Sequence, residues 1–150
     1  MNFDQDAHPN LKPFLRGFEN LSGSFSVSIE GRFEASHYLY RYFADGSDEP
    51  MHGHSWLVRM RLARNDDGIG EDGISLDFLA IRTRFDELLE RMEHVCINNL
   101  EEFKGINPTA ENIARWFFAG VREKADASGG CITEVQVYEG PYNVATFSPS

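Results

Sequence analysis

The chain has 150 residues, of which 41% are hydrophobic, and its formal net charge is −10. This length and composition suit a folded domain with a buried core rather than a disordered chain. The negative charge disfavours nucleic acid and anionic membranes as partners, and no apolar run approaches the roughly 20 residues that would span a bilayer.

The N-terminal segment, residues 1–22, has no regular hydrophobic period and is punctuated by prolines and glycines. We expect an irregular extension here, with a short helix around Leu11 to Asn20 as one option, followed by a single domain over residues 23–150. The segment lacks the basic start and apolar run of a secretory signal. The two cysteines, Cys96 and Cys131, are too few for a disulfide framework, so we expect a cytoplasmic protein.

Two alternating stretches follow and predict an antiparallel pair of strands. Apolar residues share one parity from Phe25 to His37 and again from His52 to Leu62, as half-buried strands require. Gly31 interrupts the first stretch and marks a candidate bulge. Residues 38–51 between the strands are rich in turn-forming residues. If the strands pair, the histidines at their joined ends lie on one apolar face.

The rest of the chain predicts two helices followed by two strands, which cover residues 78–92, 109–121, 131–139 and 144–147. Asp77 and Thr109 are the candidate N-caps of the helices, whose apolar residues recur at helical spacing. Alternation of apolar and polar residues returns in the two strands. The order ββααββ predicts an α+β domain in which two helices back a four-stranded antiparallel sheet.

His37, His52 and His54 form a candidate metal site. His52 and His54 lie two residues apart on a strand, so both imidazoles point to one side, and Gly53 between them gives the backbone freedom. Three histidines with an open fourth position are typical of catalytic zinc. One histidine on an apolar face is more often a hydrogen-bonded core residue, but three neutral imidazoles side by side need a common reason. The pattern therefore predicts a Zn²⁺ site.

Cupin-type oxygenases also bind a metal through a His-x-His motif, and they are the main alternative from the residues alone. Their motif needs a glutamate shortly after the second histidine, whereas residues 55–58 contain no carboxylate. Two long helices also fit a cupin poorly. The pattern therefore favours a different metal-binding fold.

Two further features have both a functional and an ordinary interpretation. Glu93 beside His94 could form a proton relay in which the acid fixes the imidazole tautomer. Glu139 ends the apolar face of the third strand, where its carboxylate could accept two parallel N–H bonds from a planar, guanidine-like ligand. A solvated helix end and an exposed strand end are the commoner origins of such residues. From the residues alone, the ordinary interpretation is favoured for both.

Six short motifs occur in a characteristic order along the chain. They are Phe33-Glu34-Ala35-Ser36-His37, His52-Gly53-His54, Gly73-Ile74-Ser75-Leu76-Asp77-Phe78, Glu93-His94 with Asn98 close behind, Asn107-Pro108-Thr109-Ala110-Glu111-Asn112, and Glu139. In this order they resemble the 6-pyruvoyl-tetrahydropterin synthase and 6-carboxy-tetrahydropterin synthase family over roughly residues 25–147. Each motif is modest alone, but six in register are specific.

The resemblance implies the tunnelling fold, in which subunits associate into a barrel and usually form a hexamer, a dimer of trimers. It implies zinc held by the three histidines and a lyase that acts on the side chain of 7,8-dihydroneopterin triphosphate, whose protons the zinc acidifies. It also implies that Glu139 binds the 2-amino and N3 edge of the pterin, and that His94 with Glu93 transfers protons. The expected partners are a small-molecule pterin and other copies of the chain.

Two positions depart from the family pattern. The catalytic cysteine, four residues before His-Gly-His, is replaced by Asp48, and the usual Asp before the relay histidine is Glu93. In a subgroup of the family, a glutamate three residues before His-Gly-His replaces the cysteine. Those members resemble aldolases and leave a 6-hydroxymethyl group that feeds folate synthesis. Glu49 has this spacing, and Pro50 would hold it extended.

Asp48 and Glu49 are equally consistent with ordinary acidic residues of a loop, and Cys96 is a poor substitute because its position varies in the family. Three products stay open: 6-pyruvoyl, 6-carboxy and 6-hydroxymethyl, and the missing cysteine counts against the first two. A non-catalytic oligomer that binds zinc and pterin is the alternative from another class. The candidates for a triphosphate contact, chosen by charge alone, are Arg59, Arg61, Arg82 and Lys104.

Overall fold

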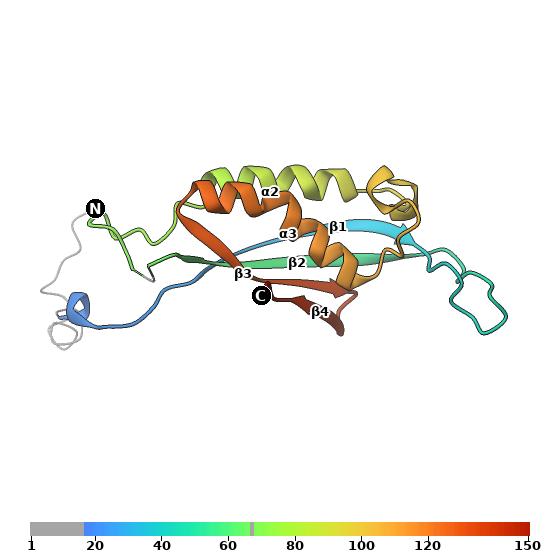
Figure 1. Ribbon diagram of the computed structural model, residues 1–150, viewed down its shortest axis with the longest axis horizontal. Coiled ribbons are helices and arrows are strands. Elements are labelled where there is room, and N and C mark those ends of the chain that lie inside the picture. The colour runs from blue at the N-terminus through green and yellow to red at the C-terminus, as the bar shows by residue number, and fades with distance from the viewer. Residues whose placement is uncertain (1–16, 67) are drawn as a thin grey trace, which may run out of the picture.

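A computed structural model of the protein describes residues 17–66 and 68–150. Its four strands are β1 (Val27–His37), β2 (His52–Arg64), β3 (Gly130–Glu139) and β4 (Asn143–Phe147), which form one antiparallel sheet in chain order. The helices α2 (Leu79–Met92) and α3 (Ala110–Ala127) both lie on one face of this sheet (Figure 1). The predicted ββααββ order and the α+β class are confirmed.

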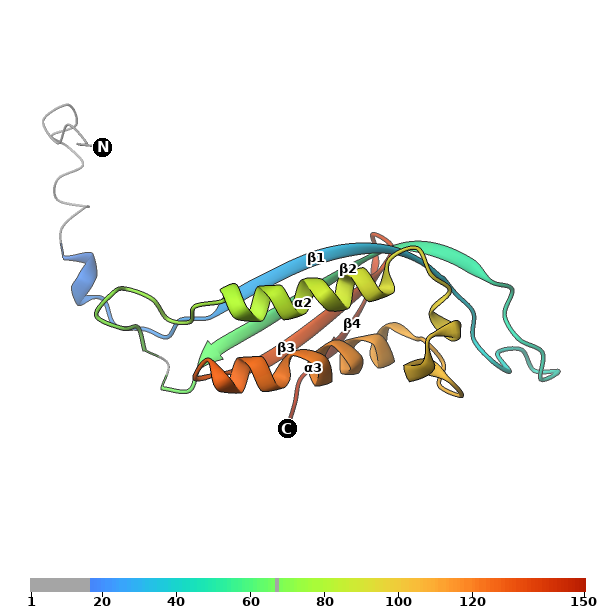
Figure 2. The ribbon, with the colours of Figure 1, turned by 90° about the horizontal axis from the view of Figure 1, so that it is seen from above.

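The core lies between the helices and the sheet, as the alternating sequence predicts. β1 and β2 pair without interruption from Val27 opposite Leu62 to His37 opposite His52. Their inward side chains, including Phe33 and Trp56, are fully buried against the helices. Figure 2 shows α2 and α3 lying next to each other across the sheet, where they contact each other. Burial of one strand face is the physical reason for the period of two.

Gly31 does not mark a bulge, which corrects the expectation from the sequence. It pairs with Val58 within the regular ladder, and a Cβ atom at this position would overlap the side chain of Leu89 on α2. The glycine therefore allows the helix to approach the strand closely. The irregularity of the sheet lies elsewhere, between Arg61 and Leu62 where β2 meets β3.

The predicted N-cap is correct for α3 and one residue too early for α2. Thr109 caps α3, because its hydroxyl oxygen accepts a hydrogen bond from the backbone N–H of Asn112. At α2 the cap position is Phe78, one residue later than expected, although Asp77 still accepts the N–H of Leu79 at 3.0 Å. Most of the short helix considered for Leu11 to Asn20 lies outside the described residues, and Phe18–Asn20 form a single 3₁₀ turn.

In the part of the chain that the structure describes, no helix combines the length and apolar character needed to cross a bilayer.

The loop between β1 and β2, residues 38–51, projects beyond one end of the sheet (Figure 1). Two asparagines fasten its first residues: Asn98 bonds the backbone N–H and carbonyl of Tyr38, and Asn107 bonds those of Tyr40. Each amide acts like a neighbouring strand and fixes the chain just after His37.

Candidate metal centre

Four potential metal ligands gather at one end of the sheet. His37 ends β1 and lies directly opposite His52, the first residue of β2. His54 follows on the same face of β2, and Glu139 ends the neighbouring strand β3. One ligand atom from each of the four lies within 4.8 Å of all the others. The structure thus brings together the three histidines predicted from the sequence and adds Glu139 to them.

Backbone carbonyls fix the tautomers of two of these histidines. Nδ1 of His37 donates to the carbonyl oxygen of Pro108 at 2.8 Å, and Nδ1 of His52 donates to that of Pro50 at 2.9 Å. A carbonyl can only accept, so both protons lie on Nδ1 and both Nε2 atoms present lone pairs. These two Nε2 atoms lie 3.2 Å apart. Such hydrogen bonds on the far ring nitrogen are typical of metal-binding histidines.

His54 and Glu139 complete the cluster. Oε1 of Glu139 lies 2.9 Å from Nε2 of His54 and 3.2 Å from Nε2 of His37. Although the first distance is short, its geometry is not that of a hydrogen bond, and Nε2 of His54 is a buried atom without a hydrogen-bond partner. Burial lowers the pKa of the His54 imidazole, which Glu139 partly counteracts. A neutral imidazole is the form that binds a metal.

The donor set fits a zinc ion. Two nitrogen atoms bound tetrahedrally to one zinc at about 2.0–2.1 Å lie roughly 3.3 Å from each other. The separation of 3.2 Å between Nε2 of His37 and Nε2 of His52 is close to this value. Facing lone pairs repel one another unless a cation or proton lies between them, and imidazole is a ligand that zinc prefers. The buried, unpartnered nitrogen of His54 would gain a partner in the same way.

Aromatic packing holds the cluster in place. Trp56 is fully buried, and its ring lies edge-on to His37 and His54 with centroid distances of 5.0 and 5.4 Å. The indole N–H of Trp56 donates to the carbonyl of Ala35 at 3.2 Å, and its ring stacks on Phe33. The floor of the site is therefore part of the hydrophobic core, so the imidazoles are positioned before any ligand arrives.

The two acidic candidates of the loop have different surroundings. Glu49 lies at the edge of the cluster, with Oε1 3.9 Å from Nε2 of His52 and Oε2 accepting the N–H of Leu39 at 3.2 Å. Asp48 instead accepts the backbone N–H of Arg41 at 2.8 Å, which stabilises the loop itself. The structure thus places Glu49, rather than Asp48, beside the candidate ligands.

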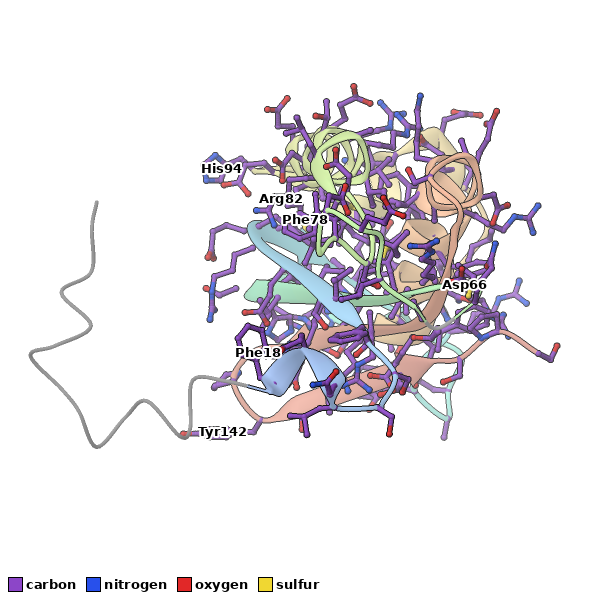
Figure 3. All side chains as sticks on the ribbon, turned by 90° about the vertical axis from the view of Figure 1, so that its left-hand side faces the viewer. Phe18, Asp66, Phe78, Arg82, His94 and Tyr142 are labelled. Atoms are coloured by element: carbon purple, nitrogen blue, oxygen red, sulfur yellow. The ribbon has the colours of Figure 1, made fainter. Side chains whose placement is uncertain are left out.

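Glu93 and His94 lie in contact, as the relay hypothesis requires. Oε1 of Glu93 lies 3.1 Å from Nε2 of His94, while Oε2 accepts the backbone N–H of Glu34 at 2.9 Å. His94 has a positive φ of 56° and donates its backbone N–H to the carbonyl of Glu34 at 2.7 Å. This conformation is uncommon for a residue other than glycine. Figure 3 shows the His94 side chain projecting outward at the edge of the molecule.

An open pocket of about 500 Å³ is lined by His94 and, across the β1–β2 ladder, by Glu34, Ser36 and Ser55, which lie on the sheet face opposite the imidazole rings; His54 also contributes to its wall. Gly53 and Ser55 contribute its wall on β2. Gly53 does not have a positive φ, and a Cβ there would meet only the carbonyl of Ala35 at 3.8 Å. Backbone freedom is therefore not what this position requires; the absent side chain leaves room in the pocket.

Cys96 also lines the pocket, which the sequence did not indicate. It forms an isolated bridge with Ser36, and its thiol lies 3.8 Å from Oδ1 of Asn98. Cys96 lies only two residues after His94 in the sequence, which could have indicated its position. Both residues belong to a segment that pairs with the edge of β1.

Charge alone did not identify which basic residue could contact a triphosphate. Arg59 pairs with Glu30, Arg61 with Glu134 and Arg82 with Asp86. Arg32 was not among the candidates, yet it is exposed on the sheet face opposite the helices and forms no ion pair with the described residues. A second pocket of about 320 Å³ contains Arg32 together with Ser55, and Ser55 also lines the first pocket.

Comparisons with known proteins match most of the chain. A sequence model of the family described as 6-pyruvoyl tetrahydropterin synthase matches residues 26–150. A 6-carboxy-5,6,7,8-tetrahydropterin synthase from Synechocystis is 32% identical over 97 residues, which are 63% of this chain and 72% of the relative.

Solved structures share the fold at lower identity. The 6-pyruvoyl tetrahydropterin synthase of Caenorhabditis elegans superimposes with a TM-score of 0.68 at 19% identity, over 85% of this chain and 97% of the other. The Plasmodium vivax 6-pyruvoyltetrahydropterin synthase gives a TM-score of 0.61 at 18% identity, over 84% and 98% of the two chains. That protein was studied as variants in which a glutamate, described as its catalytic residue, is replaced by alanine or cysteine. The expected fold is confirmed.

Proposed function

Because the chain belongs to the 6-pyruvoyl tetrahydropterin synthase family, we propose that it is a zinc-dependent lyase acting on the side chain of 7,8-dihydroneopterin triphosphate or a related pterin. The observation that carries this proposal is the cluster of three imidazole nitrogens and the Glu139 carboxylate at one end of the sheet. A lyase of this kind needs a Lewis acid and a proton-transfer group: the cluster can hold the first, and His94 paired with Glu93 can supply the second.

Four residues of the cluster would bind the metal and the pterin ring. His37, His52 and His54 hold the zinc ion, which, when bound, acidifies hydroxyl groups of the pterin side chain. Glu139 accepts the 2-amino and N3 hydrogens of the pterin ring through its two carboxylate oxygens.

Glu49 takes the place of the missing cysteine as the acid-base group. Its carboxylate lies beside the cluster, whereas Asp48 is engaged within the loop. A glutamate is also described as the catalytic residue of the Plasmodium vivax protein, which supports the use of a carboxylate in this fold. Since the cysteine-free subgroup resembles aldolases, we favour side-chain cleavage that leaves a 6-hydroxymethyl group.

This cleavage can be written with the chain's own groups. Glu49 removes the proton of the hydroxyl on the second side-chain carbon, and the bond between the first and second carbons breaks as that hydroxyl becomes an aldehyde. The electron pair passes to the first carbon and is delocalised into the pterin ring. His94, oriented by Glu93, delivers a proton to that carbon and so yields the 6-hydroxymethyl product.

Arg32 is the cation best placed for the triphosphate. It lines a pocket that shares Ser55 with the pocket beside His94, and it forms no ion pair with a carboxylate of the described residues. Its guanidinium can donate charge-assisted hydrogen bonds to an anionic group.

We also propose a homo-oligomer, a hexamer built as a dimer of trimers, in the cytoplasm. The outer edge of β4 has no partner strand within residues 17–66 and 68–150, so it is free to pair with another copy. Edge-to-edge association of sheets is the way that a barrel removes such exposed edges.

Incubation of the zinc-loaded chain with 7,8-dihydroneopterin triphosphate, followed by chromatography of the products, tests the activity. We expect consumption of the substrate with a 6-hydroxymethyl product. A 6-pyruvoyl or 6-carboxy product would keep the lyase but exclude the aldolase-like cleavage. Tight pterin binding without turnover would instead support the non-catalytic, zinc- and pterin-binding oligomer.

A further inference from the structure

We propose that Glu139 has two alternating partners: it is the fourth ligand of the metal in the free protein, and it leaves the metal when it binds the pterin ring. Pterin binding thereby opens the coordination position that the substrate side chain needs. This inference rests on the proposed function, since it assumes both the zinc site and the pterin anchor.

The position of Oε1 is the first argument. It lies 2.9 Å from Nε2 of His54 and 3.2 Å from Nε2 of His37, and so occupies the fourth corner of the cluster. The contact with His54 lacks hydrogen-bond geometry, and the imidazole nitrogen is buried without another partner. A carboxylate oxygen and nitrogen lone pairs gain nothing from this proximity unless a metal ion or a proton lies between them, and only a metal ion can contact all four groups at once.

The chemistry of the anchor is the second argument. Two parallel hydrogen bonds to the 2-amino and N3 edge of a pterin use both carboxylate oxygens of Glu139. Oε1 is directed into the cluster in the present arrangement, so only one oxygen would be available for the ring. The carboxylate must therefore turn away from the histidines before it can bind the pterin in this way.

The surroundings of Glu139 allow this turn without a change of fold. Its backbone is held at the end of β3 between Trp56 on β2 and Asn143 on β4. The next residue, Gly140, donates its N–H to the carbonyl of Ser55 at 3.2 Å. The side chain itself is 29% exposed, so one side of it faces open space rather than the core. A rotamer change, which needs no strand movement, is sufficient.

Thermodynamic linkage gives the proposal a measurable consequence. If the metal and the pterin ring compete for one carboxylate, each weakens the binding of the other by the same factor. A pterin that lacks side-chain hydroxyls cannot replace the lost ligand, so it isolates this competition. The full substrate would offset the loss, because its hydroxyls can enter the vacated position.

Co²⁺ and 6-methylpterin are the probes for the test, since Co²⁺ reports its coordination through its visible spectrum. Co²⁺ affinity is measured by chelator competition in the wild-type chain and in Glu139→Gln, Glu139→Ala and Asp48→Asn, each with and without 6-methylpterin. We expect both Glu139 variants to bind Co²⁺ about ten-fold more weakly, the magnitude typical of one coordination contact. Asp48→Asn is the matched control, because it removes a carboxylate that bonds within the loop rather than to the histidines, and it should leave Co²⁺ affinity unchanged.

In the wild-type chain, saturating 6-methylpterin should change the Co²⁺ spectrum and weaken Co²⁺ binding about ten-fold, the reciprocal of the same coupling. Unchanged spectrum and affinity, with pterin binding shown by its fluorescence, would overturn this inference and leave the proposed function standing. A Glu139→Ala variant that binds Co²⁺ as tightly as the wild-type chain would also overturn this inference. Failure of the wild-type chain to bind Co²⁺, or to bind 6-methylpterin, would overturn the proposed function together with the inference.

Discussion

The backbone carbonyl of Pro108 accepts a 2.8 Å hydrogen bond from Nδ1 of His37. This bond connects the segment before α3 to the metal cluster and leaves the Nε2 lone pair of His37 free for a cation. The neighbouring residues have related tasks: Asn107 fastens the loop after His37, and Thr109 caps α3. A short motif therefore orients one ligand, fixes the adjacent loop and begins a helix.

Replacement of His37 by asparagine should separate metal binding from folding. The shorter amide can still donate a hydrogen bond to the carbonyl of Pro108 but places no atom where Nε2 was. We expect metal analysis to find about one zinc per wild-type chain and almost none in His37→Asn. The metal-free forms should differ in unfolding free energy by less than about 2 kcal/mol, measured with denaturant.

The control for this experiment is His94→Asn, which removes an imidazole that lies in the pocket but outside the cluster. It should retain the zinc of the wild-type chain. Full zinc content in His37→Asn, or loss of zinc in His94→Asn, would contradict the assignment of the ligands.

Glu49→Gln should abolish most of the turnover while zinc stays bound. The amide oxygen can still accept the N–H of Leu39, so the loop is preserved, but the group no longer accepts a proton. We expect kcat to fall about 10²- to 10⁴-fold, the usual contribution of a general base. The rate is followed by the disappearance of 7,8-dihydroneopterin triphosphate.

Asp48→Asn and Cys96→Ser are the matched controls for Glu49. The asparagine keeps the oxygen that accepts the N–H of Arg41, and the serine keeps a donor toward Asn98. Both should retain kcat within a few-fold. A rate for Glu49→Gln equal to that of the wild type would return Glu49 to an ordinary loop residue, and a collapse in Cys96→Ser would point to the thiol instead.

Replacement by alanine should affect substrate binding at one glycine of the β1–β2 ladder and stability at another. In Gly53→Ala the new methyl meets only a carbonyl at 3.8 Å, so the fold and the zinc content should be preserved, while the methyl narrows the pocket and raises KM. In Gly31→Ala the methyl overlaps Leu89 on α2, and unfolding free energy should fall by about 1–3 kcal/mol. Denaturant unfolding and steady-state kinetics are measured on both variants. A Gly53→Ala variant with reduced unfolding free energy and an unchanged KM would contradict this prediction.

Arg32→Ala should weaken the binding of phosphorylated substrate specifically. Loss of one charge-assisted hydrogen bond, worth about 1.5 kcal/mol, raises KM for 7,8-dihydroneopterin triphosphate about ten-fold. KM for 7,8-dihydroneopterin, which carries no phosphate, should not change. Arg82→Ala, whose guanidinium pairs with Asp86 on α2, is the control that removes a positive charge elsewhere. Equal effects on both substrates would show that Arg32 does not contact the phosphates.

The sequence by itself determined the order of elements and the cluster of histidines. Burial of one face of a strand forces alternation, and burial of one stripe of a helix forces a period near 3.6, so both are visible locally. The spacing of His52 and His54 places both on one strand face, and pairing of Val27 with Leu62 carries His37 to the position opposite His52. These features follow from periodicity and a continuous register.

Only the tertiary structure decided the relationships between residues far apart in the chain. It placed Oε1 of Glu139 inside the histidine cluster, separated the environments of Glu49 and Asp48, and brought His94 and His54 to one pocket. It also showed that Gly31 makes room for Leu89 rather than forming a bulge. Such contacts depend on loop paths and on how helices pack against the sheet, which no local pattern encodes.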